Sequence, residues 1–213
     1  METLWKPLEE LNAYGGAREC IERGRMPVQI SGCIDGQKSH LISGLAQSKK
    51  WTVIVAANER KARELLADYR MYDKEAVFYP AKDVIFYSAD VHGNAVETER
   101  LKTIKSLFDQ EGGTVITTMT AGMEYVQSLS VYKKSCRCLE EGGQVDLEEL
   151  TRSLADMGYE RQGQVDGPGE YSIRGGILDI YPPTGECPYR IELWGDEIDT
   201  IRSCLLYTSD AAD

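Results

Sequence analysis

An alternating segment near the end of the chain constrains the fold more than any other feature. Within 165–203, the residues at 189–194 switch between apolar and polar, so an extended strand would place them on opposite sides. The two sets are Tyr189, Ile191 and Leu193 on one side and Arg190, Glu192 and Trp194 on the other. Tryptophan beside arginine is typical of partner-binding strands. Periodicity alone leaves two interpretations open: a partner-binding side, or a Trp194 that covers a helix and an Arg190 that only pairs with Glu192.

A second arginine precedes this strand. The run 171–181 predicts one strand, in which Arg174 shares the side of apolar residues and would be buried. A bulge at Gly175-Gly176 would reset the alternation and place Arg174 on the open side. The alternative is a half-buried Arg174 paired with Asp179 or Glu170, and the pattern does not decide between them.

Apolar, β-branched runs alternate with helical patterns over the first part of the chain. This order predicts the α/β class, a parallel sheet covered by helices on both faces, in a first domain over 1–130. The predicted strands are 28–31, 51–57, 76–79 and 114–118.

The pattern changes after residue 130. A helix over 147–157, capped by Asp146, lies between predicted strands, and shorter links follow it. The predicted strands are 136–140, 159–165, 171–181, 189–194 and 198–202. We therefore expect a second, α+β antiparallel domain over 131–203.

The segment after the first predicted strand resembles a phosphate-binding loop. Gly32 follows a strand-like run, and Lys38-Ser39 open a helical pattern, which is the usual setting of a P-loop. The motif needs glycine immediately before the lysine, and here that residue is Gln37. Asp35 adds negative charge where a phosphate would lie. The sequence therefore predicts a degenerate P-loop that binds no nucleotide.

No residue pattern argues for catalysis or for a metal. Ser39 and His40 are neighbours on a predicted helix and do not face each other. Cys136 and Cys138 are spaced too closely for an ordinary zinc half-site. We expect no catalytic residues, no metal ligands and no cofactor in this chain.

Charge and hydropathy limit the partners. The net charge of −11 disfavours autonomous binding of duplex DNA, which calls for a basic surface, and it suits a partner with a basic patch. No run of about 18 apolar residues is present, so we expect no membrane span. The first residues carry acids and lack an apolar signal core, which predicts a cytoplasmic protein.

The last ten residues, CLLYTSDAAD at 204–213, read as a translated sequencing adapter. We expect them to be an artefact that follows a natural sequence cut at about Ser203, so that the second domain is C-terminally incomplete.

Two motifs carry a family resemblance. GEYSIRGGILDIYP at 169–182 and PYRIELWGDEIDTIRS at 188–203 resemble the second domain of bacterial transcription-repair coupling factors (Mfd), within their UvrB-like N-terminal module. FYPAKDVIFYSADVHGNAVETERL at 78–101 and MGYERQGQVDGPGEYSIRGG at 157–176 extend the resemblance, which covers essentially 1–203. UvrB shares these motifs in weaker form, but Gln37 and the short 83–93 segment, which has no room for UvrB's DNA-clamping hairpin, separate it from this chain.

The resemblance implies a first domain that is a RecA-like remnant without nucleotide. It also implies a second domain that binds UvrA through Arg174, Arg190 and Trp194. The family is expected to have an aromatic residue at the last of these positions. The parent family recruits UvrA to RNA polymerase stalled at DNA damage, and its ATP- and Mg-dependent DNA translocase motor and polymerase-binding domain would lie outside this chain. The chain itself would then be an interaction module and no enzyme.

The alternative is the start of a UvrB-like ATP-dependent DNA-handling enzyme with a variant P-loop. That alternative requires ATP binding that depends on Lys38. Under either interpretation the missing final strands predict an exposed sheet edge at 198–203.

Overall fold

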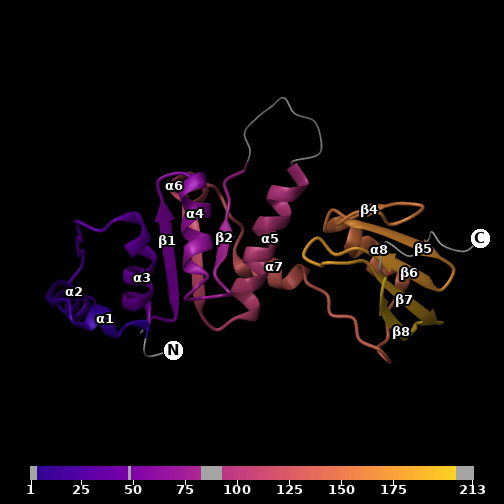
Figure 1. Ribbon diagram of the computed structural model, residues 1–213. Coiled ribbons are helices and arrows are strands. Elements are labelled where there is room, and N and C mark those ends of the chain that lie inside the picture. Colours follow the sequence, from indigo (N-terminus) through magenta and orange to yellow (C-terminus); the bar gives the residue numbers. More distant parts are fainter. Residues whose placement is uncertain (1–3, 48, 83–92, 205–213) are drawn as a thin grey trace, which may run out of the picture. The chain divides into compact units, whose positions relative to one another are not determined.

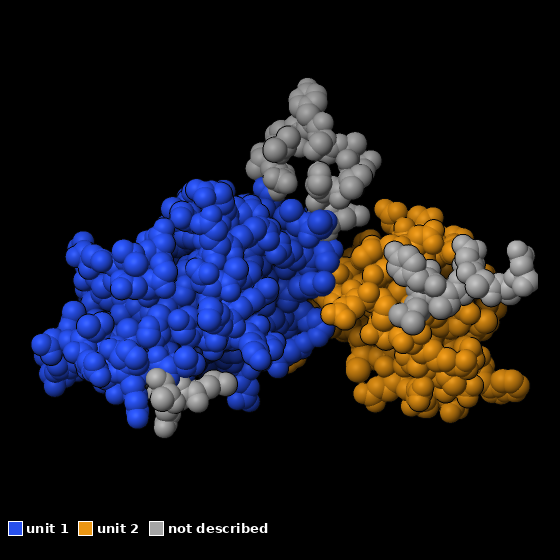
Figure 2. Space-filling model, viewed as in Figure 1, with its two compact units in different colours: residues 1–125 blue, residues 126–213 orange. Residues whose placement is uncertain are grey.

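The computed structural model describes residues 4–47, 49–82 and 93–204. It divides the chain into two compact units, 1–125 and 126–213 (Figure 2). Most of the 83–93 segment and all but the first residue of the 204–213 tail lie outside the described residues.

Unit 1 is built on a parallel sheet (Figure 1). Its strands are β1 (Trp51–Ala56), β2 (Val77–Tyr79) and β3 (Gly113–Thr118), in the order β1-β3-β2. The β-branched residues of these strands favour the extended backbone, and Ile54 and Phe78 both lie opposite Ile116 of the central strand. The three side chains form the centre of the unit 1 core.

Helix α4 (Glu59–Tyr69) covers one face of this sheet. Its first turn is capped by Asn58, whose side chain accepts a hydrogen bond from the backbone N–H of Lys61 at 2.9 Å, as expected for this residue type. Ala62, Leu66 and Tyr69, at helical spacing, are buried against the core.

Helices α3, α5 and α6 pack around this centre, and α1 packs against α2. Helix α5 packs beside β2, where the hydroxyl of Thr103 donates to the backbone oxygen of Phe78 at 2.6 Å. Helix α3 packs against α4 and brings Ile42 to the core. The bounds are α1 (Lys6–Glu9), α2 (Asn12–Glu22), α3 (Asp35–Ala46), α5 (Gly93–Asp109) and α6 (Met119–Met123).

Two predictions for unit 1 are wrong. Residues 28–31 form no strand; Gln29 and Ile30 are exposed, so the run lacks the burial that a central strand needs. The sheet is also not covered on both faces at β1, because Val53 is 65% and Val55 is 52% exposed. Within the described residues, the α-helices bury only the Ile54 side of this edge strand.

Unit 2 is a five-stranded sheet with one helix against its apolar face. Helix α8 (Leu147–Asp156) begins after Asp146, whose carboxylate accepts from the backbone N–H groups of Glu148 and Glu149. It buries Leu150 and Leu154 against the sheet, and the short α7 (Leu129–Ser135) precedes it. The strands, in sheet order, are β4 (Glu160–Arg161), β5 (Glu170–Arg174), β6 (Ile177–Ile180), β7 (Tyr189–Trp194) and β8 (Glu197–Ser203).

The strand pattern of unit 2 differs from the prediction in three places. Residues 136–140 form no strand, and only two residues of 159–165 do so, as β4, which runs parallel to β5. Residues 171–181 form two strands of a hairpin, because Gly175 adopts a positive φ of 62° and reverses the chain. A tight turn therefore stands where a bulge was expected, and the sheet is mixed.

The edge at β8 is partly occupied. The backbone N–H of Ile198 donates to the oxygen of Gly143 at 2.9 Å, and the oxygen of Ile198 accepts from Gly142 at 2.7 Å. Farther along, the N–H of Ile201 donates to the carboxylate of Glu141 at 2.9 Å. The prediction of an exposed edge at 198–203 is thus wrong for these two residues.

None of the helices in the described part of the chain has both the length and the apolarity needed to cross a membrane.

Candidate functional site

The two sides of β7 have opposite environments, as their alternation predicts. Ile191 is only 4% exposed and packs with Leu178 and Ile198 beneath α8. Trp194 is 86% exposed, so it covers no helix within the described residues. Trp194 therefore lies outside the unit's own core.

Strand register brings several polar side chains to the side of the sheet that carries Trp194. Asp179 lies opposite Ser172 on β5 and opposite Arg190 on β7, and Arg190 lies opposite Arg202 on β8. Residues two apart on one strand share a side, which adds further members. We call this set the open face: Arg174, Asp179, Arg190, Glu192, Trp194 and Arg202.

Asp179 binds both arginines that the sequence singles out. The Nε and Nη2 groups of Arg190 donate to its two carboxylate oxygens at 2.7 and 2.9 Å. Nη2 of Arg174 donates to Oδ2 at 2.9 Å. These bonds, led by those from Arg190, lower the pKa of Asp179 below its ordinary value of 3.8, against the raising effect of burial. Asp179 in turn raises the already high pKa of Arg190.

The structure decides the ion pairing of Arg174 and Arg190, which the sequence left open. Arg174 pairs with Asp179, as one alternative had it, yet its side chain is 59% exposed and lies on the open face. Arg190 pairs with Asp179 across the sheet and not with Glu192. Glu192 instead pairs with Arg202 at 3.3 Å. The structure thus brings Arg174 and Arg190 onto one carboxylate, and it places Trp194 farther along the same side of β7.

Sequence reasoning missed Arg202 as a member of the open face. The turn at Gly195-Asp196 alone would place Arg202 opposite Tyr189. The register shifts by one residue between Leu193 and Glu192, which brings Arg202 opposite Arg190, and strand periodicity does not show this shift.

The open face is equipped for recognition. It offers guanidinium groups with unused donors, since Nη1 of Arg190 has no partner within the described residues. It also offers a large exposed indole, and no nucleophile stands beside a base there. Such a surface can bind carboxylates and an apolar pocket on another protein.

The residues predicted to form a degenerate P-loop lie in unit 1, whereas the open face belongs to unit 2. Nζ of Lys38 donates to the carboxylate of Asp35 at 2.6 Å, and Lys61 approaches the same group at 3.2 Å. Ser39 is buried, and no strand ends before this segment in the described residues. Gly32 and Gln37 flank the start of α3, so the strand that would complete a P-loop is absent from this part of the chain.

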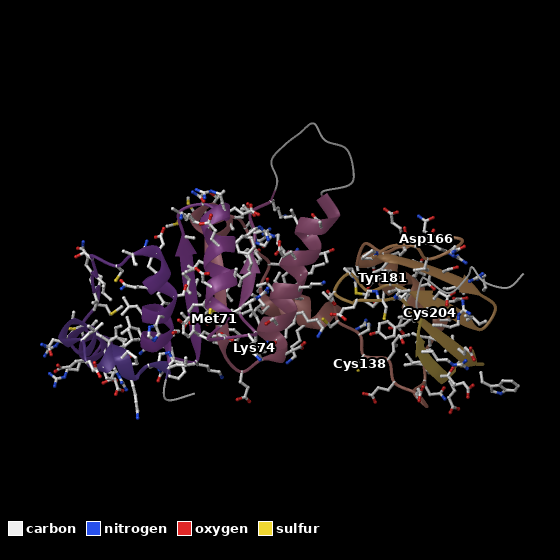
Figure 3. All side chains as sticks on the ribbon, viewed as in Figure 1. Met71, Lys74, Cys138, Asp166, Tyr181 and Cys204 are labelled. Atoms are coloured by element: carbon white, nitrogen blue, oxygen red, sulfur yellow. The ribbon has the colours of Figure 1, made fainter. Side chains whose placement is uncertain are left out.

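His40 and the cysteines form no site. The His40 ring stacks on Tyr72 and lies 2.6 Å from the oxygen of Leu4, so it packs within unit 1. Cys138 and Cys204 lie on separate segments of unit 2 (Figure 3). Over the residues the structure describes, no group of three or more His, Cys, Asp or Glu side chains could hold a metal ion.

Comparison of the sequence with known proteins identifies its family. Residues 138–212 match the UvrB interaction domain. The chain is 33% identical over 189 residues to the transcription-repair-coupling factor of Bacillus subtilis strain 168, covering 82% of this chain. It is 31% identical over 193 residues, 84% of this chain, to that of Staphylococcus epidermidis strain RP62A.

A further relative is the transcription-repair-coupling factor of Staphylococcus aureus strain USA300, 30% identical over 193 residues. In each comparison the chain spans 16% of the length of the relative. The chain belongs to the transcription-repair-coupling factor family, as its UvrB-like N-terminal module, and its second unit contains a UvrB interaction domain.

Proposed function

We propose that this chain is the UvrA-recruiting module of a transcription-repair-coupling factor and that the open face of unit 2 is its UvrA-binding surface. The observation that carries the proposal is Trp194, an 86% exposed tryptophan on the strand that also presents Arg190. It lies inside the segment that matches the UvrB interaction domain.

The energetics favour a partner for this side chain. A tryptophan buries about 150–250 Å² in an interface, which contributes on the order of 4–6 kcal/mol before the costs of association. Arginines with unused donors add charge-assisted hydrogen bonds to carboxylates. Arg174, Arg190 and Trp194 are therefore the residues that we assign to the contact.

For unit 1 we propose a RecA-like remnant that binds no nucleotide. Three parallel strands with helical connections support the fold assignment. Gln37 in place of glycine, and the pairing of Lys38 with Asp35, support the loss of nucleotide binding. On this view the unit is a scaffold, and this chain catalyses no reaction.

The parent protein is proposed to couple this module to an ATP- and Mg-dependent DNA translocase and to RNA polymerase. The relatives are named transcription-repair-coupling factors, and the chain spans 16% of their length. Contacts to polymerase and DNA, and the motor itself, would belong to the remaining length. Transcription takes place in the bacterial cytoplasm, which is where we place the parent.

Calorimetric titration of the chain with purified UvrA tests the proposal. We expect saturable binding by the wild type and its loss in the Arg174→Ala/Arg190→Ala/Trp194→Ala variant. The matched control is Arg152→Ala, since Arg152 is an exposed arginine on α8 with no ion pair within the described residues. Equal binding by the triple variant and by the wild type would exclude the open face as the contact surface.

A further inference from the structure

Asp179 is a buried carboxylate on a face whose arginine side chains are exposed. The residue is only 8% exposed, whereas the side chains of Arg174 and Arg190 are 59% and 41% exposed. It lies on β6, between β5 and β7, and cross-strand pairing holds its backbone on both sides. The carboxylate is thus fixed in position beneath two long, more exposed side chains.

The hydrogen bonds to Asp179 occupy some of the N–H groups of each arginine and leave others without an acceptor in the described residues. Asp179 receives the Nε and Nη2 groups of Arg190 and the Nη2 group of Arg174. In the described residues no acceptor occupies Nη1 of Arg190, or Nε and Nη1 of Arg174. Each guanidinium is therefore anchored at one edge and keeps donors for another molecule.

Anchoring of this kind changes the cost of binding. Ordering a long, rotamer-rich side chain in an interface costs about 0.5–1.5 kcal/mol, and that cost falls when the free protein already holds the bound conformation. The carboxylate is itself too covered to reach a partner.

We propose that Asp179 is a positioning residue of the open face, an inference that rests on the proposed UvrA-binding function. Asp179 makes no contact with UvrA, and it orders the side chains of Arg174 and Arg190 so that they can bind carboxylates on UvrA. The partner chemistry follows from the unused donors, which suit planar anionic acceptors.

Asp179 also has an opposing effect on binding. Asp179 also neutralises part of the arginine charge, so its removal makes the face more positive and favours encounter with an acidic partner. That gain acts mainly on the association rate at an exposed, salt-screened surface. The loss of order acts on both arginines and increases dissociation. We therefore expect a net loss of affinity, with an unchanged or faster association rate.

The first test uses the free chain. In the wild type, the heteronuclear NOE of the Arg190 Nε–H group should be close to that of the rigid backbone, and in Asp179→Asn it should fall to that of a mobile side chain. Asp199→Asn is the matched control, because Asp199 is an exposed aspartate of β8 without an ion pair in the described part of the chain. A rigid Arg190 in Asp179→Asn would overturn the proposal.

The second test measures UvrA binding in a double-mutant cycle. Asp179→Asn should weaken binding about tenfold, equivalent to about 1.4 kcal/mol, in the wild-type background. In the Arg174→Ala/Arg190→Ala background it should cause no further loss, because Asp179 acts only through those two side chains. An equal loss in both backgrounds would mean a structural role and would refute positioning, as would unchanged or tighter binding in the wild-type background.

The two tests distinguish a failure of the proposed UvrA-binding function from a failure of the positioning role of Asp179. Absence of binding by the wild-type chain would contradict the proposed function, and the NOE measurement would still decide whether Asp179 orders the arginines. If Asp179→Asn does not fold, Asp179→Glu replaces it. The longer carboxylate keeps the charge but cannot meet both arginines from the same backbone position, so it should loosen Arg190 and weaken binding in the same way.

Discussion

Asp179 and Arg190 lie directly opposite each other on β6 and β7, and the guanidinium of Arg190 binds both oxygens of the carboxylate, at 2.7 and 2.9 Å. A cross-strand pair of this kind brings two side chains closer than residues two apart on one strand. That geometry explains why Arg190 is paired with Asp179 and leaves Glu192 to Arg202. Because Arg174 binds the same carboxylate, the group has an excess of positive charge on a chain whose net charge is −11.

We predict that Arg190→Ala and Trp194→Ala each weaken UvrA binding by about 2 kcal/mol or more, roughly 30-fold, because interface energy concentrates in arginine and tryptophan anchors. Trp194→Phe should retain most of the affinity, since it keeps an aromatic group. Calorimetry gives the affinities, and unchanged circular dichroism shows that the fold is kept. Unaltered affinity in both alanine variants would remove the site assignment.

We predict that Asp179 contributes to stability only when ionised. Its pKa is lowered in the folded chain, chiefly by Arg190, so the contribution is fully present above the ordinary aspartate value of 3.8 and is lost as the pH falls through the lower folded value. The difference in Tm between the wild type and Asp179→Asn should therefore be larger at neutral pH than below the folded pKa. A difference that stays constant across this range would show that the charge is not what matters.

We predict that the chain shows no saturable ATP binding. Lys38 is bound by Asp35, and no strand precedes this segment in the described residues. Isothermal titration of wild type and Lys38→Ala with Mg-ATP should give the same flat response. Binding that disappears in Lys38→Ala would instead favour the UvrB-like ATP-dependent enzyme.

We predict that Gly176→Ala destabilises unit 2. A Cβ at this position would lie 2.8 Å from the backbone oxygen of Leu193, closer than carbon and oxygen can approach. Relieving that contact means shifting β7 or the turn, at a cost on the order of 1–3 kcal/mol in the free energy of unfolding. Gly163→Ala is the control, because its Cβ would meet nothing within 4 Å. Urea denaturation measures the difference, and equal midpoints would contradict the expected collision.

We predict that Glu141→Ala promotes self-association. The substitution frees the N–H of Ile201 on the outer edge of β8, and an unpaired edge donor invites another strand. Glu140→Ala, which removes a neighbouring exposed carboxylate, should leave the chain unaffected. Sedimentation velocity at increasing concentration distinguishes the two variants, and identical profiles would count against the capping role.

Local patterns predicted much of the fold. The bounds of β7 and the Asp146 cap of α8 follow from alternation and capping chemistry. The strands predicted at 28–31 and 136–140 are wrong because a short run that contains apolar residues suggests a strand whether or not a neighbouring strand exists to pair with it. Pairing is a tertiary property that the local sequence does not contain.

The open face was predictable only in part. Alternation placed Arg190 and Trp194 on one side of the sheet. It left two environments open for Arg174, exposed on the open side or half-buried, and the turn at Gly175 was needed to decide between them. Arg202 and the shared carboxylate of Asp179 emerge from the register of four strands. Contacts among residues on different strands therefore required the structure.

The exposure of Trp194 gives the chain an intrinsic optical signal. Trp5 donates its indole N–H to Ser43 at 3.1 Å and Trp51 is partly buried, so the indole most open to water is that of Trp194. Its emission should dominate the long-wavelength part of the tryptophan fluorescence spectrum. Its indole should also be the most accessible of the three to quenching by acrylamide. A protein that covers the open face would shift this emission to the blue and protect it, so occupancy of the surface can be followed without any label.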